Sequence, residues 1–180
     1  LFTTGTKAPA VFWASARTLD DKAIDLNNEA VELWLNLDTL QTPVSPTYIA
    51  ETGMSADSLL TQAIALRTSA GYTLADSNRT ALRYNFTAKR FNLVLDASKT
   101  DTVELNAIRR DFTEEVRPSA GYVDGSPLRL AALHGSGLCA FYTDRLGEAR
   151  LAYETLHKQS NNQYFDTLKM QVNLRTLLDG

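Results

Sequence analysis

Apolar side chains in this chain recur at helical spacing, in segments that proline or glycine separates. In residues 20–38 the apolar positions are three, four, seven and eight apart, which places them on one face of an α-helix. Residues 55–70 repeat the pattern, and two closely spaced prolines, Pro43 and Pro46, break the chain between these segments. A chain patterned in this way is predicted to bury one stripe of each helix against its neighbours.

The middle of the chain is less regular. Residues 77–91 fit either a helix or a short strand, because their aromatic side chains suit both, and residues 92–96 are expected to be extended. Asp101 is predicted to cap a helix over residues 102–116. Glu104 stands three residues after this cap, as in a capping box.

The last third of the chain contains a strong helix start and a strong interruption. Pro127 suits the first position of a helix, and residues 134–137, His-Gly-Ser-Gly, are expected to interrupt that helix. The longest helix is predicted over residues 138–159. A polar turn should then lead to a final amphipathic segment at residues 164–178.

These segments predict an all-α fold, an antiparallel four-helix bundle with extended terminal and connecting segments. Residues 1–16 carry an apolar cluster and are interpreted as a terminal arm that covers one end of the bundle. The chain has 180 residues and 44% hydrophobic residues, enough to bury one sizeable core. Residues 1–180 are therefore interpreted as a single domain.

Charge and cysteine usage restrict the function. The formal net charge is −3, whereas a general nucleic-acid-binding protein is usually basic. A few arginines on one surface can still neutralise phosphates while acids elsewhere set the net sign. Cys139 is the only cysteine, which excludes an internal disulfide and a thiolate metal cluster. No apolar run reaches the ~20 residues of a membrane span, and the first residues lack a signal-peptide pattern, so we expect a soluble protein in a reducing compartment.

Residues that commonly carry catalysis are few and poorly spaced. Glu154 and His157 stand three apart on one predicted helix, a weak metal-binding pattern that more often marks a solvated face. His134 lacks the strand–turn–helix context of a serine nucleophile, and Cys139 fits a small buried apolar residue. We therefore expect no enzyme, no metal and no cofactor, with a small enzyme that has a cryptic site as a minor alternative.

Two adjacent arginines, Arg109 and Arg110, are the candidate binding residues. Neighbours on a helix point about 100° apart, so both guanidinium groups can reach one polyanion lying across the helix end. The alternative is that both arginines are exposed and paired with the nearby acids Asp111, Glu114 and Glu115.

A motif just before these arginines resembles a known family. Its residues are Arg90, Phe91, Asn92, Leu93, Val94, Leu95 and Asp96. This motif is similar to a signature of the coat proteins of rod-shaped plant viruses of the tobacco mosaic virus type, and the spacing from Asp96 to Arg109 and Glu114 runs without a gap. Weaker matches in the family's order lie at residues 161–166 and 11–16.

The resemblance implies a four-helix coat (capsid) protein that self-assembles into a helical, rod-shaped particle around single-stranded genomic RNA. Such a protein is found in the virion and, during assembly, in the host cytoplasm, and it needs no membrane. The resemblance implies that Arg109 contacts RNA phosphate, and that Arg110 replaces a second family arginine whose position here is Asp111. Asp96 and Glu114 are implied to form intersubunit carboxylate contacts, which share protons or bind cations and make assembly sensitive to pH.

Two points stay open in the sequence. The family's further arginine motif, at the start of its last bundle helix, has only Arg129 or the pair Asp144-Arg145 as its nearest candidates. A second hypothesis is a helical adaptor or scaffold module that binds a protein partner, because residues 142–164 have some character of helical repeat proteins. Such modules need about three similar units, and the sequence shows no repeat.

Overall fold

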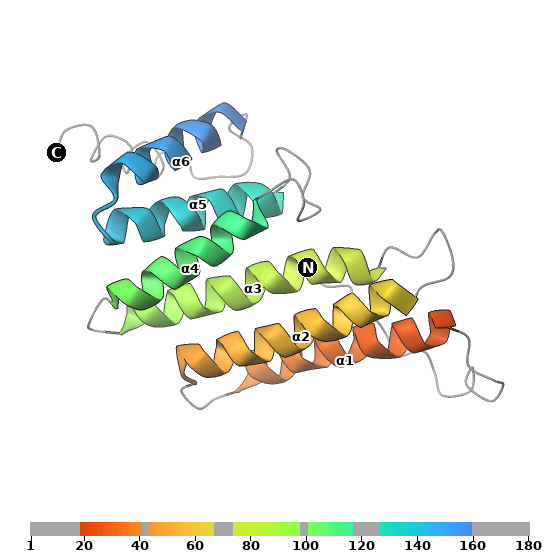
Figure 1. The fold of residues 1–180 in the computed structure, drawn as a ribbon. Coiled ribbons are helices and arrows are strands. Elements are labelled where there is room, and N and C mark those ends of the chain that lie inside the picture. The colour runs from red at the N-terminus through yellow and green to blue at the C-terminus, as the bar shows by residue number, and fades with distance from the viewer. Residues whose placement is uncertain (1–18, 41–43, 67–73, 98–100, 117–126, 160–180) are drawn as a thin grey trace. The chain divides into compact units, whose positions relative to one another are not determined.

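The computed structural model describes residues 19–40, 44–66, 74–97, 101–116 and 127–159 (Figure 1). Within those ranges the chain forms six α-helices and no β-strand, which confirms the all-α class. The helices are α1 (Leu19–Thr39), α2 (Pro46–Leu66), α3 (Leu74–Asp96), α4 (Thr102–Glu115), α5 (Pro127–Tyr142) and α6 (Leu146–Gln159). The predictions for residues 1–16, 161–166 and 164–178 lie outside the described residues.

Two compact units make up the chain, and they divide inside α3 between Phe86 and Thr87. The first unit contains α1, α2 and the first half of α3. The second contains the rest of α3 with α4, α5 and α6. The interpretation of residues 1–180 as a single domain stays a prediction.

In the first unit, α1 and α2 pack together through alanines and larger aliphatic side chains. The buried residues of these two helices include Ala23, Ala30, Val31, Leu37, Ile49, Ala56, Leu60 and Ala63. Phe86 of α3 packs edge-to-face against Trp34, with ring centroids 5.2 Å apart. A Cβ atom at Gly53 would lie 3.1 Å from the Phe86 ring, so α2 can approach this ring closely only because residue 53 lacks a side chain.

Polar contacts align α3 with the other two helices of the first unit. The amide of Asn78 donates a hydrogen bond of 2.9 Å to the side-chain oxygen of buried Asn27. Asp57 of α2 binds Arg79 at 2.8 Å and Arg83 at 3.3 Å, two arginines one helical turn apart. These bonds satisfy polar groups that would otherwise be costly to remove from water.

Helix α2 begins nine residues earlier than the predicted start at residue 55. Ser45 caps it, because its hydroxyl accepts a hydrogen bond of 3.1 Å from the backbone N–H of Tyr48, and Pro46 takes the first helical position. Ser55, predicted as the cap, instead donates to the carbonyl of Glu51 inside the helix. The predicted break between the two helices is confirmed, since α1 ends at Thr39 and α2 begins at Pro46, whereas the predicted start of the second helix at residue 55 is wrong.

Helix α3 runs without a break through residues 77–91 and 92–96. The ambiguity of the first segment is thus resolved as helix, and the expectation of an extended second segment is wrong. The buried side chains of α3 include Leu82, Phe86, Thr87, Arg90, Phe91 and Val94. These positions recur at helical and not at alternating spacing, because packing on two sides of the helix outweighs the strand preference of the valine and phenylalanine.

In the second unit, α4 begins as predicted. The Asp101 carboxylate accepts hydrogen bonds from the backbone N–H groups of Val103 and Glu104, at 2.9 and 3.0 Å. The Glu104 side chain binds Arg90 of α3. The cap is therefore confirmed, while the carboxylate expected to complete a capping box joins two helices.

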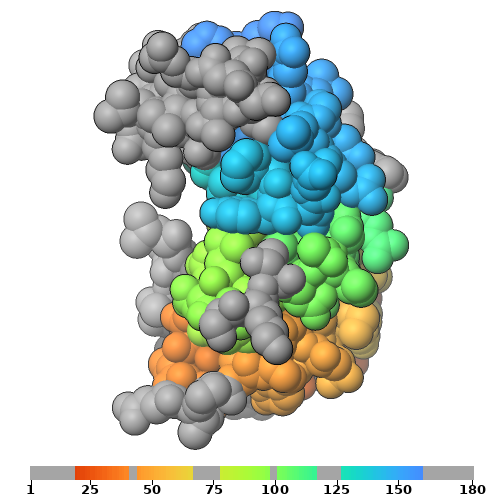
Figure 2. All heavy atoms as spheres, turned by 90° about the vertical axis from the view of Figure 1, so that its left-hand side faces the viewer, coloured from red at the N-terminus to blue at the C-terminus, as the bar shows by residue number. Residues whose placement is uncertain are grey.

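Helix α5 passes straight through His-Gly-Ser-Gly at residues 134–137, so the predicted interruption is wrong. Gly135 and Gly137 are buried contact points: Gly135 faces the Phe112 ring of α4, and Gly137 faces Tyr153 of α6. Figure 2 shows atoms of α5 and α6 lying against each other on one face. The glycines allow α5 to approach both neighbouring helices closely.

The predicted long helix over residues 138–159 is divided by a sharp turn. Asp144 has a φ of 59°, in the left-handed region. The N–H of Arg145 donates to the carbonyl of Ala140, and the N–H of Asp144 to that of Phe141. This is a Schellman motif, which ends α5 with an aspartate where glycine is usual.

Gly135→Ala is expected to destabilise the protein, because its Cβ would lie 2.6 Å from the Phe112 ring. Overpacking of this kind costs about 1–3 kcal/mol. The control is Gly147→Ala in α6, where a Cβ would meet no atom within 4 Å and should leave the free energy of unfolding unchanged or raise it. Urea unfolding measures both; equal effects of the two substitutions would contradict the close packing of α5 on α4.

Candidate nucleic-acid interface

A buried arginine fixes α4, which carries the candidate binding residues, against α3. Arg90 has a side chain only 10% exposed. Its Nε and Nη2 donate to one oxygen of Glu104 at 3.1 and 2.6 Å, and its Nη1 donates to Asp111 at 2.5 Å. The guanidinium fork thus binds two carboxylates that lie seven residues, or about two helical turns, apart along α4, a geometry that lysine cannot reproduce.

Around this ion-pair group, other contacts reinforce the same pairing of helices. Thr87, one turn before Arg90, donates a hydrogen bond of 2.8 Å to the buried carboxylate of Glu115. Phe91 packs edge-to-face on Phe112, with ring centroids 6.2 Å apart. These contacts pair early residues of this part of α3 with late residues of α4, so the two helices run antiparallel.

Arg109 does not extend into solvent. Its side chain is 19% exposed, and its Nη1 donates to an oxygen of Glu148 on α6 at 2.5 Å. Its Nε is buried and has no hydrogen-bond partner among the described residues. In the sequence, the acids available to pair with Arg109 were those of its own helix. In the structure its partner is Glu148, which lies 39 residues further along the chain.

Glu148 also binds a second arginine. Its other oxygen accepts from Nη1 of Arg145 at 3.1 Å, and Nε of Arg145 donates to the amide oxygen of Asn106 at 3.0 Å. One carboxylate is therefore shared by two guanidinium groups, which leaves the group Arg109–Glu148–Arg145 with a net charge of +1. We call these three residues and Asn106 the arginine cluster.

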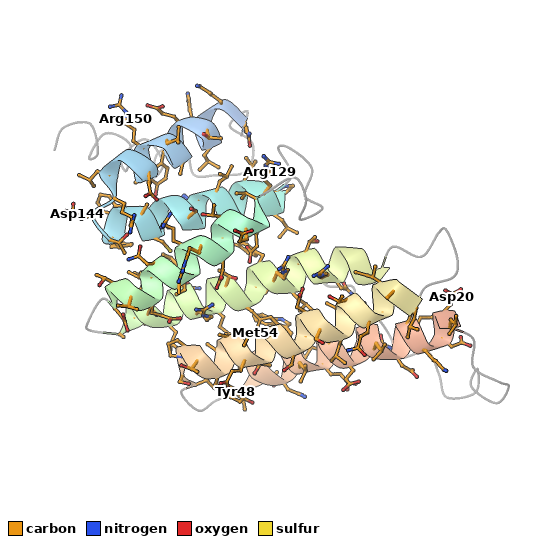
Figure 3. All side chains as sticks on the ribbon, in the orientation of Figure 1. Asp20, Tyr48, Met54, Arg129, Asp144 and Arg150 are labelled. Atoms are coloured by element: carbon orange, nitrogen blue, oxygen red, sulfur yellow. The ribbon has the colours of Figure 1, made fainter. Side chains whose placement is uncertain are left out.

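Of the two further arginines that the sequence left open, one lies near Arg109 and the other does not. Arg145 follows the end of α5, beside Arg109, whereas Arg129 lies in the first turn of α5. Sixteen residues of helix span about 24 Å. Figure 3 shows Arg129 and Asp144 at opposite ends of α5. Arg145 is thus the arginine that the fold brings to Arg109.

Cys139 lies in the buried face of α5 and is influenced by the charge of Arg109. Burial raises the pKa of this thiol to about 12, and the positive charge of Arg109 opposes only part of that rise. The thiol stays protonated at neutral pH, so it is a poor nucleophile. This agrees with its interpretation as a small buried apolar side chain.

Arg110 is the exposed member of the predicted pair. It lies about 100° around α4 from Arg109, whose guanidinium is directed to α6. The two arginines therefore do not converge on one point within a subunit. A polyanion that contacts both has to cross α4.

The two predicted carboxylates are exposed and distant from each other. Asp96 ends α3, level with the start of α4, and Glu114 lies in the last turn of α4. From Thr102, the first residue of α4, to Glu114 the helix rises about 18 Å. Within one subunit they cannot share a proton or a cation.

The weak catalytic candidates have structural roles. Glu154 accepts a hydrogen bond of 2.9 Å from Arg150, and Ser136 shares one of 3.2 Å with Thr113. The His134 ring packs edge-to-face on Tyr153. Within the described ranges, no three metal-ligating side chains come together.

Comparison with known proteins gives no assignment: no family, curated protein or solved structure matches this chain. Among the helices that the structure describes, none has both the length and the apolar character needed to cross a bilayer.

Arg90→Ala is expected to lower the free energy of unfolding by about 2–4 kcal/mol, because it leaves two carboxylates without their shared cation. The loss is smaller than for a fully buried pair, since the Asp111 side chain is 47% exposed. Arg150→Ala, which removes an arginine 56% exposed from its pair with Glu154, should cost less than about 0.5 kcal/mol. Denaturant unfolding measures both. Equal losses would show that Arg90 does not fix α4.

Proposed function

We propose that this protein is a coat protein whose subunits assemble into a helical rod around single-stranded RNA. The carrying observation is the motif at residues 90–96, followed at the matching spacing by Arg109 and Glu114. The fold is compatible with this, since successive helices in each unit run antiparallel, as in the four-helix bundle that belongs to the proposal. The proposed location is the virion, with the host cytoplasm during assembly.

Charge placement supports RNA as the ligand. Arg110 is exposed on α4, and the arginine cluster, which includes Arg109 of the same helix, adds a net charge of +1, although the whole chain is acidic. Arginine contacts to phosphate carry no sequence information, which suits a subunit that has to coat every part of a genome.

The positions of Asp96 and Glu114 are compatible with contacts between copies. Because helix α4 keeps them apart within a subunit, repulsion or proton sharing between them requires a second subunit. Contacts between different surfaces of identical subunits generate a helix when they do not close a ring.

Exposed apolar side chains favour self-association. They also fit a second candidate function, a helical adaptor that binds a protein partner. Met54 is 66% exposed, Val103 79% and Leu151 65%. In a rod, such side chains would be covered by neighbouring subunits. In a helical adaptor they would bind a different protein, and the purified chain would then not polymerise.

Negative-stain microscopy of the purified protein, with and without single-stranded RNA, tests the proposal. Rods are expected at acid pH, where the intersubunit carboxylates are protonated, and shorter assemblies at neutral pH, where ionised carboxylates repel. The double variant Asp96→Asn, Glu114→Gln should keep rods at neutral pH, whereas Glu29→Gln on α1 should behave as the wild type. A monomer at every pH and salt concentration, without RNA affinity, would contradict the proposal.

Arg110→Ala is expected to weaken binding to single-stranded RNA of any sequence. Loss of one phosphate contact should lower the slope of log K against log salt by about 0.7. Lys158→Ala, which removes an exposed positive charge from the last turn of α6, is the matched control and should leave the slope unchanged. Fluorescence anisotropy over a salt series measures both variants, and identical slopes would exclude Arg110 from the interface.

A further inference from the structure

The two oxygens of Glu148 are each bound by a different arginine. Oε2 accepts from Arg109 and Oε1 accepts from Arg145. The two non-bridging oxygens of a phosphodiester group have the same charge and the same ability to bind two guanidinium groups. The arginine cluster therefore displays the geometry of a phosphate site with a carboxylate in the place of the phosphate.

We propose that Arg109 and Arg145 form a binding site for one phosphodiester group of single-stranded RNA, and that Glu148 occupies this site in the unbound subunit. This inference rests on the proposed function and deepens it. It assigns a partner to Arg109 and a new role to Arg145 and Glu148. Glu148 acts as a built-in competitor, which holds both guanidinium groups in position and lowers the affinity of a single subunit for RNA.

The cluster can exchange its anion at little cost. Glu148 is 47% exposed and lies in the first turn of α6, so its carboxylate can rotate into water without opening the core. Other contacts also restrain the two arginines. Nε of Arg145 stays bound to Asn106, and most of the Arg109 side chain, which is 19% exposed, is packed among the helices.

Two further features suit an incoming phosphate. Glu148 lies in the first turn of α6, where the free backbone N–H groups and the positive end of the helix dipole favour an anion. Displacement of the carboxylate would also uncover a local charge of +2, since both arginines would lose the anion that they share. RNA can supply that anion better than a small free ion, because an RNA chain binds through many phosphates at once.

The test compares Glu148→Gln with Asp144→Asn in binding to a single-stranded RNA of mixed sequence, measured by anisotropy in a buffer without phosphate. Both substitutions remove one negative charge from the same end of the second unit. Asp144 makes no ion pair with a described residue, and asparagine tolerates its left-handed backbone. The Glu148→Gln variant is expected to bind RNA about fivefold or more tightly than the Asp144→Asn variant. A factor of about five is the lower end of the usual range for coupling between two sites.

A double-mutant cycle completes the test. In an Arg145→Gln background, Glu148→Gln should no longer tighten binding, because one half of the site is missing. Circular dichroism melts confirm that each variant is folded. At matched ionic strength, orthophosphate should displace RNA no better than chloride does.

The outcomes separate the two claims. Equal gains from Glu148→Gln and Asp144→Asn would show a general charge effect, and unchanged or weaker binding by Glu148→Gln would show that Glu148 does not compete; either result overturns the inference and leaves RNA coating intact. Selective displacement by orthophosphate would also overturn it, in favour of a site for free phosphate. Absence of RNA binding by every variant, including the wild type, would remove the proposed function itself.

Discussion

The ion pairs of Arg90 are the interaction on which the arrangement of the second unit depends. One guanidinium group, largely shielded from water, binds Glu104 and Asp111 at two levels of α4. Two attachment points fix both the rotation and the height of a helix, which a single contact cannot do. Since α4 carries Arg109 and Arg110, the direction of every proposed RNA contact on this helix follows from a residue that is itself out of reach of RNA.

Close packing of α5 against α4 and α6 brings the other residues of the arginine cluster to α4. Gly135 lets α5 approach the Phe112 ring, and Gly137 lets it approach α6. The turn at Asp144 then reverses the chain sharply enough to bring Arg145 and the start of α6 back to α4. The residues of the arginine cluster come from α4, from the turn after α5 and from α6. The two glycines of α5 set its distances from α4 and α6.

Two charged groups in the second unit have opposite compositions and opposite exposure. Around Arg90, two carboxylates share one buried cation, and this group is closed and structural. Around Glu148, two cations share one half-exposed carboxylate, and this group keeps a positive excess at the surface. A buried charge is expensive to leave unpaired, so the first group resists change, whereas the second can exchange its anion for another.

The sequence by itself determined the helical class, the first helix to within one residue at each end, the Asp101 cap and the start of α5 at Pro127. These follow from local periodicity and from capping chemistry, which a few neighbouring residues decide. Only the tertiary structure decided that residues 92–96 are helical, that the glycines near His134 are packing sites and that Asp144 ends α5. It alone joined Arg109, Glu148 and Arg145, because no local signal relates side chains that lie 36 to 39 residues apart until the helices have packed.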